Sequence, residues 1–287
     1  MFKKYDSHSV HLILFILISF TFSWLLWTPS LLSSVGVLEF SYNYEVLRFL
    51  GSFGPTFAGL LLTILVEGKE ETIFLWKRCW HTYNLKYSLV ALFLIPVLFA
   101  LSLWFVIIIH GALPQEEGIL RELKLSIPTF IFLFFFAGPL QEEIGWRGYM
   151  LDHLQLKYDA LSSSIILGGI WGVWHFPLFY IAGTPYANQT FFNFSSTLIV
   201  VSILFTWLYN NTNGSVLIAM IFHASINMNY FTFWDYNTAL GNILFSIMLN
   251  IVAAVIIIVF RPKTLTRKKR DDIRWFYKRP RSPQIVK

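Results

Sequence analysis

The sequence predicts an all-α, polytopic integral membrane protein with about eight transmembrane helices, forming one bundle with an intramembrane polar cavity. Of its 287 residues, 56% are hydrophobic and only 13% are charged, whereas a soluble domain carries about 25% charged residues. Several apolar runs reach the roughly 20 residues that a helix needs to cross a bilayer. No polar stretch of soluble-domain length separates these runs.

Eight apolar segments are interpreted as membrane spans from their length and hydropathy. The first begins like a signal peptide, but its apolar run is too long for a signal core and no small-x-small cleavage site follows it. We therefore expect this segment to be retained as a span. The predicted spans cover residues 9–32, 46–66, 87–110, 127–149, 160–183, 195–211, 214–233 and 239–260.

The second predicted span contains the sequence GSFGPTFAG, which is rich in small residues. Gly51, Gly54, Ala58 and Gly59 lie near Pro55 in this stretch. Small residues at such spacing allow two helices to approach closely in a membrane. We therefore expect this span to pack tightly against a neighbour.

The distribution of Lys and Arg predicts that both termini lie in the cytoplasm, because cytoplasmic loops are enriched in these residues. Loops near residues 33–45, 184–194 and 234–238 contain neither, and an even number of spans puts both ends on one side. Residues 261–287 hold eleven Lys and Arg against two Asp. They are predicted to be a basic cytoplasmic tail that contacts anionic lipid and not nucleic acid, while residues 1–260 form the membrane domain.

An acidic pair follows the apolar run FIFLFFFA inside the fourth predicted span. A charged group at the centre of a membrane helix costs about 2.5–3.5 kcal/mol on insertion scales, so such residues are functional by default. Glu143 and Arg147 are spaced i, i+4 and can pair on one helix face. Glu142 is rotated by about 100° from Glu143, and we expect it to face a water-filled cavity.

Two histidines also lie deep in predicted spans, at positions 175 and 223. His223 and Asn227 are spaced i, i+4 and project together from the seventh span. Carboxylates and imidazoles can move protons, while imidazole and amide donors can stabilise an oxyanion. This set is compatible with a hydrolase, with a zinc site made by Glu142, His175 and His223, or with a proton-coupled transporter.

The three polar segments together resemble the motifs of the CPBP family of intramembrane proteases, also called the Abi family. That family includes the type II CAAX prenyl endopeptidase and bacterial bacteriocin-processing or immunity proteins. Its pattern is EExxxR, an aromatic-xxxH motif and then HxxxN or HxxxD. The matching segments are Glu142–Arg147, Trp171–His175 and His223–Asn227, within a motif core of about residues 125–230. One departure is Trp171, where the family usually has Phe.

The resemblance implies an intramembrane endopeptidase that cleaves a membrane-associated or lipid-modified peptide. Glu142 would activate water with His175 as its partner, His223 and Asn227 would form an oxyanion hole, and Glu143 with Arg147 would support the site. No metal is favoured, because Asn227 is a poor zinc ligand and a good oxyanion donor; Zn²⁺ is the alternative cofactor. The candidate residues for lining the substrate cavity are Trp146, Trp171 and Trp174.

A second hypothesis is a non-proteolytic membrane scaffold or bacteriocin-immunity protein of the same fold. The intact motif residues favour the enzyme. We expect the plasma membrane of a prokaryote as its location. The natural substrate is not readable from the sequence.

Overall fold

The computed structural model describes residues 7–37, 44–81, 84–111, 119–187, 189–232 and 238–268, and these residues form helices joined by turns and short connections. The predicted lipid-binding residues 269–287 of the tail lie outside the described part of the chain.

The helices follow the chain in an order close to that of the predicted spans. Their bounds are α1 (Ser7–Ser34), α2 (Glu45–Gly51), α3 (Gly54–Leu62), η1 (Thr63–Glu67), α4 (Lys69–Arg78), α5 (Leu85–His110), α6 (Ile119–Phe136), α7 (Pro139–Gly145), η2 (Trp146–Met150), α8 (Leu151–Lys157), α9 (Ala160–Trp174), η3 (Phe176–Tyr180), α10 (Phe191–Asn211), α11 (Val216–Thr232) and α12 (Ala239–Phe260). The all-α fold class is therefore confirmed for the described residues.

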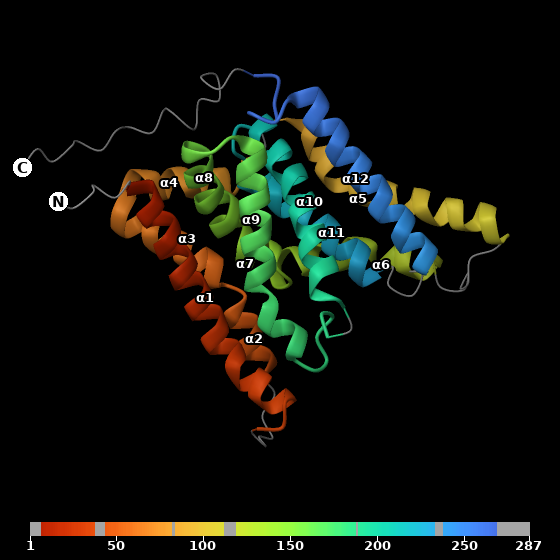
Figure 1. Cartoon of the computed structure of the whole chain (residues 1–287), viewed down its shortest axis with the longest axis horizontal. Helices are drawn as coiled ribbons and strands as arrows, with labels where there is room; N and C mark the ends of the chain where they lie inside the picture. The colour runs from red at the N-terminus through yellow and green to blue at the C-terminus, as the bar shows by residue number, and fades with distance from the viewer. Residues whose placement is uncertain are drawn as a thin grey trace, which may run out of the picture.

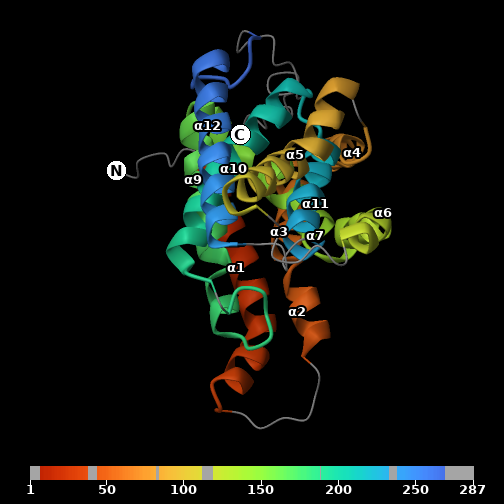
Figure 2. The same ribbon diagram turned by 90° about the vertical axis from the view of Figure 1, so that its right-hand side faces the viewer.

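Helix α7 lies in the middle of the bundle, in contact with α3, α6 and α11 (Figures 1 and 2). The contact with α3 is very close, because a Cβ atom added to Gly145 would lie 2.1 Å from the carbonyl oxygen of Pro55. A Cβ added to Gly59 would lie 3.0 Å from the Cα of Gly145. The predicted close packing of the second span is confirmed, and its partner is the helix that carries the acidic pair.

Among the described residues, fewer helices than the eight predicted are long and apolar enough to cross a membrane. Six described helices are long and apolar enough to cross a membrane, and a seventh candidate is the pair Lys124–Phe136 and Pro139–Lys157, bent by 47°. Helix α11 has an apolar part of only Val216–Tyr230 and falls short of that length. The difference lies at two places: the chain breaks between α6 and α7, and the described apolar part of α11 is short. The protein is nonetheless a multi-pass membrane protein.

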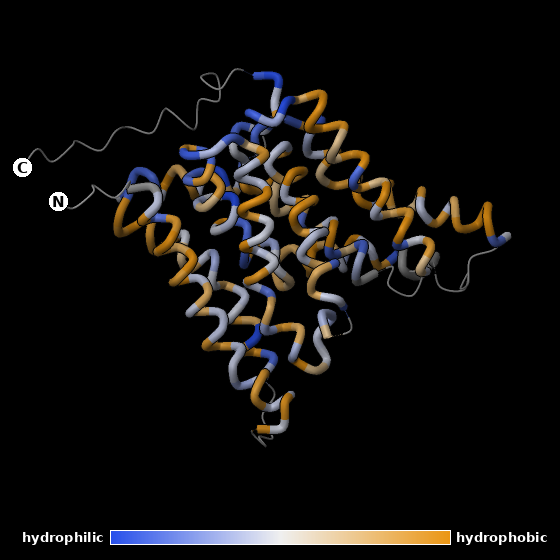
Figure 3. Tube along the Cα trace, in the orientation of Figure 1, coloured by the Kyte–Doolittle hydropathy of each residue, from blue (hydrophilic) through white to orange (hydrophobic). Residues whose placement is uncertain are grey.

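The first turns of α1 and the chain after α12 lie at the same end of the bundle. Lys157 at the end of α8 donates to the Ser9 hydroxyl at 2.6 Å, while the amide of Ala160 three residues later donates to the Lys263 carbonyl at 3.1 Å. This end is hydrophilic, whereas the middle of the bundle is largely apolar (Figure 3). The segment that follows α12 packs on the bundle here, with Leu265 fully buried.

A buried ion pair joins three helices near this end. Arg78 on α4 donates to Asp152 on α8 at 2.9 Å and to the carbonyl of Gly148 at 2.7 Å. Tyr209 on α10 accepts a hydrogen bond from Arg78 and donates one to Asp152 at 2.7 Å. Arg78 and Asp152 are only 2% and 5% exposed. Each charge is therefore stabilised by its partner and not by water.

Replacing Asp152 by Ala is expected to lower the free energy of unfolding by about 3–5 kcal/mol, because the Arg78 guanidinium would stay buried without its carboxylate. The measurement is an unfolding titration of the purified protein in mild detergent. The matched control is Asp159→Ala, which removes the side-chain cap of α9 and should cost about 1 kcal/mol. Equal losses for the two variants would contradict this account of the ion pair.

Candidate active site

The site forms at the break between α6 and α7, where Gly138 adopts φ 112°. This is a conformation that residues with a side chain rarely adopt. The amide of Gly138 donates to the side-chain oxygen of Gln141 at 2.8 Å. From α11, the side-chain amide of Asn227 donates to the carbonyl of Ala137 at 2.6 Å. The break is therefore held from both sides, and α7 starts at a defined angle to α6.

Glu143 is the most deeply buried acid of the site, with no exposed surface. Arg147, one turn along, donates to its two oxygens at 2.8 and 3.0 Å. Nδ1 of His223 on α11 lies 2.7 Å from Oε1 of Glu143. The Arg147 guanidinium lies over the rings of Phe205 and Trp171, at 3.7 and 4.5 Å from their centroids. The pairing predicted for Glu143 and Arg147 is confirmed, and the pair also holds a histidine.

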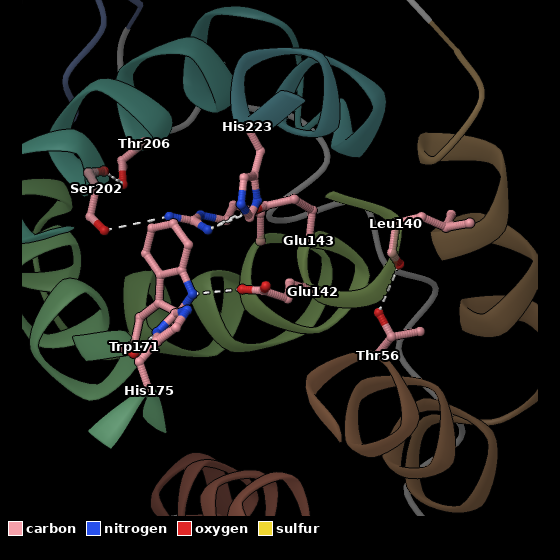
Figure 4. A network of polar contacts seen from close by, with 10 residues as sticks. Thr56, Leu140, Glu142, Glu143, Trp171, His175, Ser202, Thr206 and His223 are labelled. Atoms are coloured by element: carbon pink, nitrogen blue, oxygen red, sulfur yellow. Dashed lines mark hydrogen bonds and ion pairs between the residues drawn. The ribbon is translucent and has the colours of Figure 1, made fainter. Parts of the chain in front are cut away.

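Glu142 points to a different side of α7, as Figure 4 shows. Its Oε2 accepts a hydrogen bond of 2.7 Å from the indole Nε1 of Trp171. Its other oxygen, Oε1, faces the missing side chain of Gly138: a Cβ built there would lie 3.0 Å from Oε1 and 3.1 Å from Nε2 of His223. Glu142 and His223 thus both reach the place beside the Cα of Gly138, where a side chain would crowd them. We call this place the Gly138 gap.

His175 ends α9 beside the same tryptophan. Its Nδ1 lies 2.8 Å from the carbonyl of Trp171, so this nitrogen carries the proton and Nε2 keeps the lone pair in the neutral ring. The imidazole packs against Tyr186 and Phe194, with centroids 5.4 and 5.1 Å away. Among the described hydrogen bonds, none joins His175 to Glu142. Trp171 connects them instead, through its carbonyl and its indole.

The hydrogen bond to Glu143 determines what His223 can do. Because Nδ1 donates to the Glu143 carboxylate, the neutral ring presents the lone pair of Nε2 to the Gly138 gap. When Nε2 also gains a proton, the ring becomes a cation beside Glu143 and Nε2 becomes a donor. His223 can therefore accept a proton at the gap or stabilise negative charge there.

Glu142, His175 and His223 do not meet the geometric requirement for a shared metal ion. Within the described parts of the chain, the group of three such residues whose ligand atoms all lie within 4.8 Å of one another is found elsewhere, at His11, Glu67 and His153. We therefore derive no step through a metal at Glu142.

The structure places the remaining predicted residues in different surroundings. Trp146 and Trp174 are almost fully buried and pack against each other with centroids 5.9 Å apart, so they belong to the packed core, and their role in lining a substrate path stays a prediction. Asn227 lies one turn from His223 but uses an N–H on the Ala137 carbonyl. Its role in an oxyanion hole likewise stays a prediction, as does the water-filled cavity at Glu142.

Two residues of the site carry no signal in the motifs. Gly138 precedes the acidic pair. Its positive φ and the two atoms near its Cβ position are visible only in the structure. Tyr186 lies in the connection between η3 and α10 and packs on His175. Burial raises the pKa of Tyr186 above its ordinary value, and the negative charge of Glu142 raises it further. The phenol therefore keeps its proton and is a hydrogen-bond donor near the site.

Comparisons with known proteins show which proteins the chain resembles. A family model described as type II CAAX prenyl endopeptidase Rce1-like matches residues 124–229. CAAX prenyl protease 2 of Methanococcus maripaludis is 29% identical over 230 residues, which cover 75% of this chain and 82% of that protein. Lysostaphin resistance protein A of Staphylococcus haemolyticus is 26% identical over 208 residues, covering 68% of this chain and 50% of that protein.

Together with these matches, the buried acidic pair, two histidines and arginine indicate an intramembrane hydrolase. The matched region spans the break at Gly138 and all the residues that surround it. Over these residues the chain resembles the Rce1-like CPBP family of intramembrane proteases. It is a CAAX-protease-type intramembrane endopeptidase.

Replacing Trp171 by Phe is expected to lower kcat for peptide hydrolysis by about 10-fold, because a hydrogen bond to a carboxylate contributes about 1.5–3 kcal/mol and part of that orients Glu142. The change keeps an aromatic ring in place. The measurement is kcat and KM on a peptide substrate with the enzyme in detergent micelles.

The matched control is Trp174→Phe on the same helix, which removes the indole hydrogen bond to Ser23. It should change stability and leave kcat near the parent value. Equal losses of kcat in both variants would show that the Trp171 indole has no special part in orienting Glu142.

Replacing Gly138 by Ala is expected to reduce hydrolysis by about 100-fold, since misplacing a reacting group by about 1 Å can cost that much. The new methyl group would occupy the Gly138 gap between Glu142 and His223. The control for backbone strain is Gly68→Ala, which has φ 92° and open space at the Cβ position. If Gly68→Ala and Gly138→Ala are equally stable and lose the same activity, the loss comes from backbone strain and the Gly138 gap has no part in catalysis.

Proposed function

We propose that the enzyme hydrolyses a peptide bond with a water molecule activated by Glu142 at the Gly138 gap. The observation that carries this proposal is the convergence of a carboxylate oxygen and an imidazole nitrogen on that gap, at 3.0 and 3.1 Å from the absent Cβ. The two groups come from different helices, α7 and α11, and both approach the Cα of Gly138 from the same side.

The proposed reaction needs no cofactor. Glu142 takes a proton from water as the oxygen attacks the carbonyl carbon of the scissile bond. The carbonyl oxygen becomes an oxyanion, which accepts a hydrogen bond from the protonated Nε2 of His223. The carbon–nitrogen bond then breaks, and Glu142 returns the proton to the leaving amine. The products are a carboxylate and an amine.

Each neighbouring residue has a supporting part in this proposal. Glu143 stabilises the protonated form of His223, while Arg147 balances the charge of Glu143. Trp171 orients Glu142 through its indole. His175 is the predicted partner for proton transfer. Its Nε2 is a hydrogen-bond acceptor in the neutral ring, and the hydroxyl of Tyr186, which packs on His175, is a donor.

The proposed substrate is a membrane-associated or lipid-modified peptide. The M. maripaludis relative is called a CAAX prenyl protease, and a C-terminal Cys-aliphatic-aliphatic-X sequence is the signal for prenylation of its cysteine. A peptide of this kind enters the bundle from the bilayer, which explains why a hydrolytic site lies within apolar helices. A farnesylated peptide ending in this sequence is therefore the first probe.

We also infer the orientation of the protein in the membrane. The start of α1 and the segment after α12 share the hydrophilic end of the bundle, and this end carries Lys157, Arg261 and Lys263. By the distribution of positive charge, this end faces the cytoplasm. The proposed location is the plasma membrane of a prokaryote, with the basic tail on anionic lipid.

A second candidate function follows from the other relative, which is called a resistance protein. In this alternative the chain protects the cell as a membrane scaffold or immunity factor, and hydrolysis is not needed. The paired arrangement of Glu143, Arg147 and His223 beside the second buried acid, Glu142, favours the enzyme, because a scaffold has no use for that arrangement.

Replacing Glu142 by Gln is expected to reduce hydrolysis of the farnesylated probe by about 10²–10⁴-fold, the usual contribution of a general base. The amide has the same shape, so the bound peptide should still be captured intact and seen by mass spectrometry. Glu70→Gln on the exposed side of α4 is the control. Unchanged hydrolysis in Glu142→Gln would exclude the proposed mechanism, and an unchanged cellular phenotype would favour the scaffold.

A further inference from the structure

A second cluster of ligating side chains lies away from the candidate active site. His11 on α1, Glu67 at the end of η1 and His153 on α8 bring three ligand atoms within 4.8 Å of one another. Nε2 of His153 lies 3.0 Å from Nδ1 of His11 and 3.1 Å from Oε1 of Glu67. His153 is 1% exposed, and Glu67 is 11% exposed. Figure 1 shows the first turns of α1 beside α8.

The orientation of His153 is set by the backbone. Its Nδ1 lies 3.0 Å from the carbonyl of Tyr149, and the imidazole stacks on the Tyr149 ring with centroids 4.3 Å apart. Nδ1 therefore carries a proton, and in the neutral ring the lone pair of Nε2 points at the other two residues. A histidine that ligates a metal usually donates its other ring N–H to a carbonyl or carboxylate in this way.

This arrangement puts a positive charge at the centre of the cluster. A carboxylate oxygen accepts hydrogen bonds and does not donate them, so the lone pair of a neutral His153 would face a lone pair of Glu67 at 3.1 Å. The contact becomes favourable when a proton or a metal ion lies between them. A proton on Nε2 can be shared only poorly by two partners, whereas a metal ion binds all three at once.

The donor types and spacings select the metal. Two imidazoles and one carboxylate are a common zinc ligand set, with bonds of about 2.0–2.2 Å. Around a tetrahedral ion such bonds separate the ligand atoms by about 3.4 Å, so the observed distances of 3.0 and 3.1 Å need only a small outward shift. Imidazole ligands favour zinc and similar transition metals over Mg²⁺ and Ca²⁺.

We propose that His11, Glu67 and His153 bind a Zn²⁺ ion, or a transition-metal ion of the same class, that fastens α1 to η1 and α8. Helices α7, η2 and α8 form one helical rod, which carries the acidic pair. The ion would stabilise this rod at His153, roughly 16 Å along the rod axis from Glu142. Its role is structural and does not depend on the proposed function. A zinc ion bound here would therefore not by itself indicate that hydrolysis at Glu142 depends on a metal.

The test measures metal content and stability in the full chain, purified in detergent without a polyhistidine tag and stripped with a chelator. Addition of Zn²⁺ should restore a stoichiometry close to one ion per chain and raise Tm by several degrees, since a ligand that binds only the folded state stabilises it. Glu67→Gln and His153→Gln should both lose the bound zinc and the rise in Tm. In Glu67→Gln the amide can still donate to His153, so the fold is retained.

Two controls identify the site. Glu70→Gln, three residues from Glu67, should bind zinc as the parent does. Glu142→Gln should also keep the full stoichiometry, although it loses hydrolysis. If zinc is lost in Glu142→Gln and kept in Glu67→Gln, the ion belongs to the catalytic residues and the proposal is wrong. If the parent binds no zinc and its Tm does not move, the cluster is a hydrogen-bonded contact only.

Discussion

The fully buried carboxylate of Glu143 is the interaction on which the site depends. A charge in an apolar bundle must be paired and hydrogen-bonded, because an unpaired one costs several kcal/mol. Glu143 meets this requirement with Arg147 from its own helix and His223 from α11. The pairing therefore fixes the distance between α7 and α11, and it fixes which nitrogen of His223 faces the Gly138 gap. The neighbouring Glu142 is left with the indole of Trp171 and one oxygen directed at the gap.

Two anchors hold the helical rod made by α7, η2 and α8. One is the Glu143 cluster, and the other is the buried pair of Arg78 and Asp152. Between them the rod contains a π-helical turn, Trp146–Met150, a feature that often occurs at functional sites. The rod is thus fixed against α4 and α10 at one end and against α11 at the other. A catalytic group on such a rod keeps its position without help from a loop.

Hydropathy and spacing predicted the fold class and part of the site. The Glu143–Arg147 pair follows from helical geometry, because both residues lie on one short segment. The partnership of His223 with Glu143 spans 80 residues, and no local pattern carries it. The same holds for His11, Glu67 and His153. Among the described residues fewer spans than predicted meet the length criterion, because a hydropathy window does not detect a break at one glycine of positive φ, or the shortness of α11.

Adjacent positions on one helix give the two acids different surroundings, and this separation matters more than the presence of two carboxylates. A rotation of about 100° directs Glu143 into a closed set of donors, and it directs Glu142 toward one donor and a gap. If both acids faced the same side, Arg147 and His223 would be shared between them, and neither would have an oxygen available for water. Because Gly138 lacks a side chain, the available oxygen of Glu142 and Nε2 of His223 reach the same point. The helical offset and the glycine are therefore both part of the geometry on which the proposed role of Glu142 as a base depends.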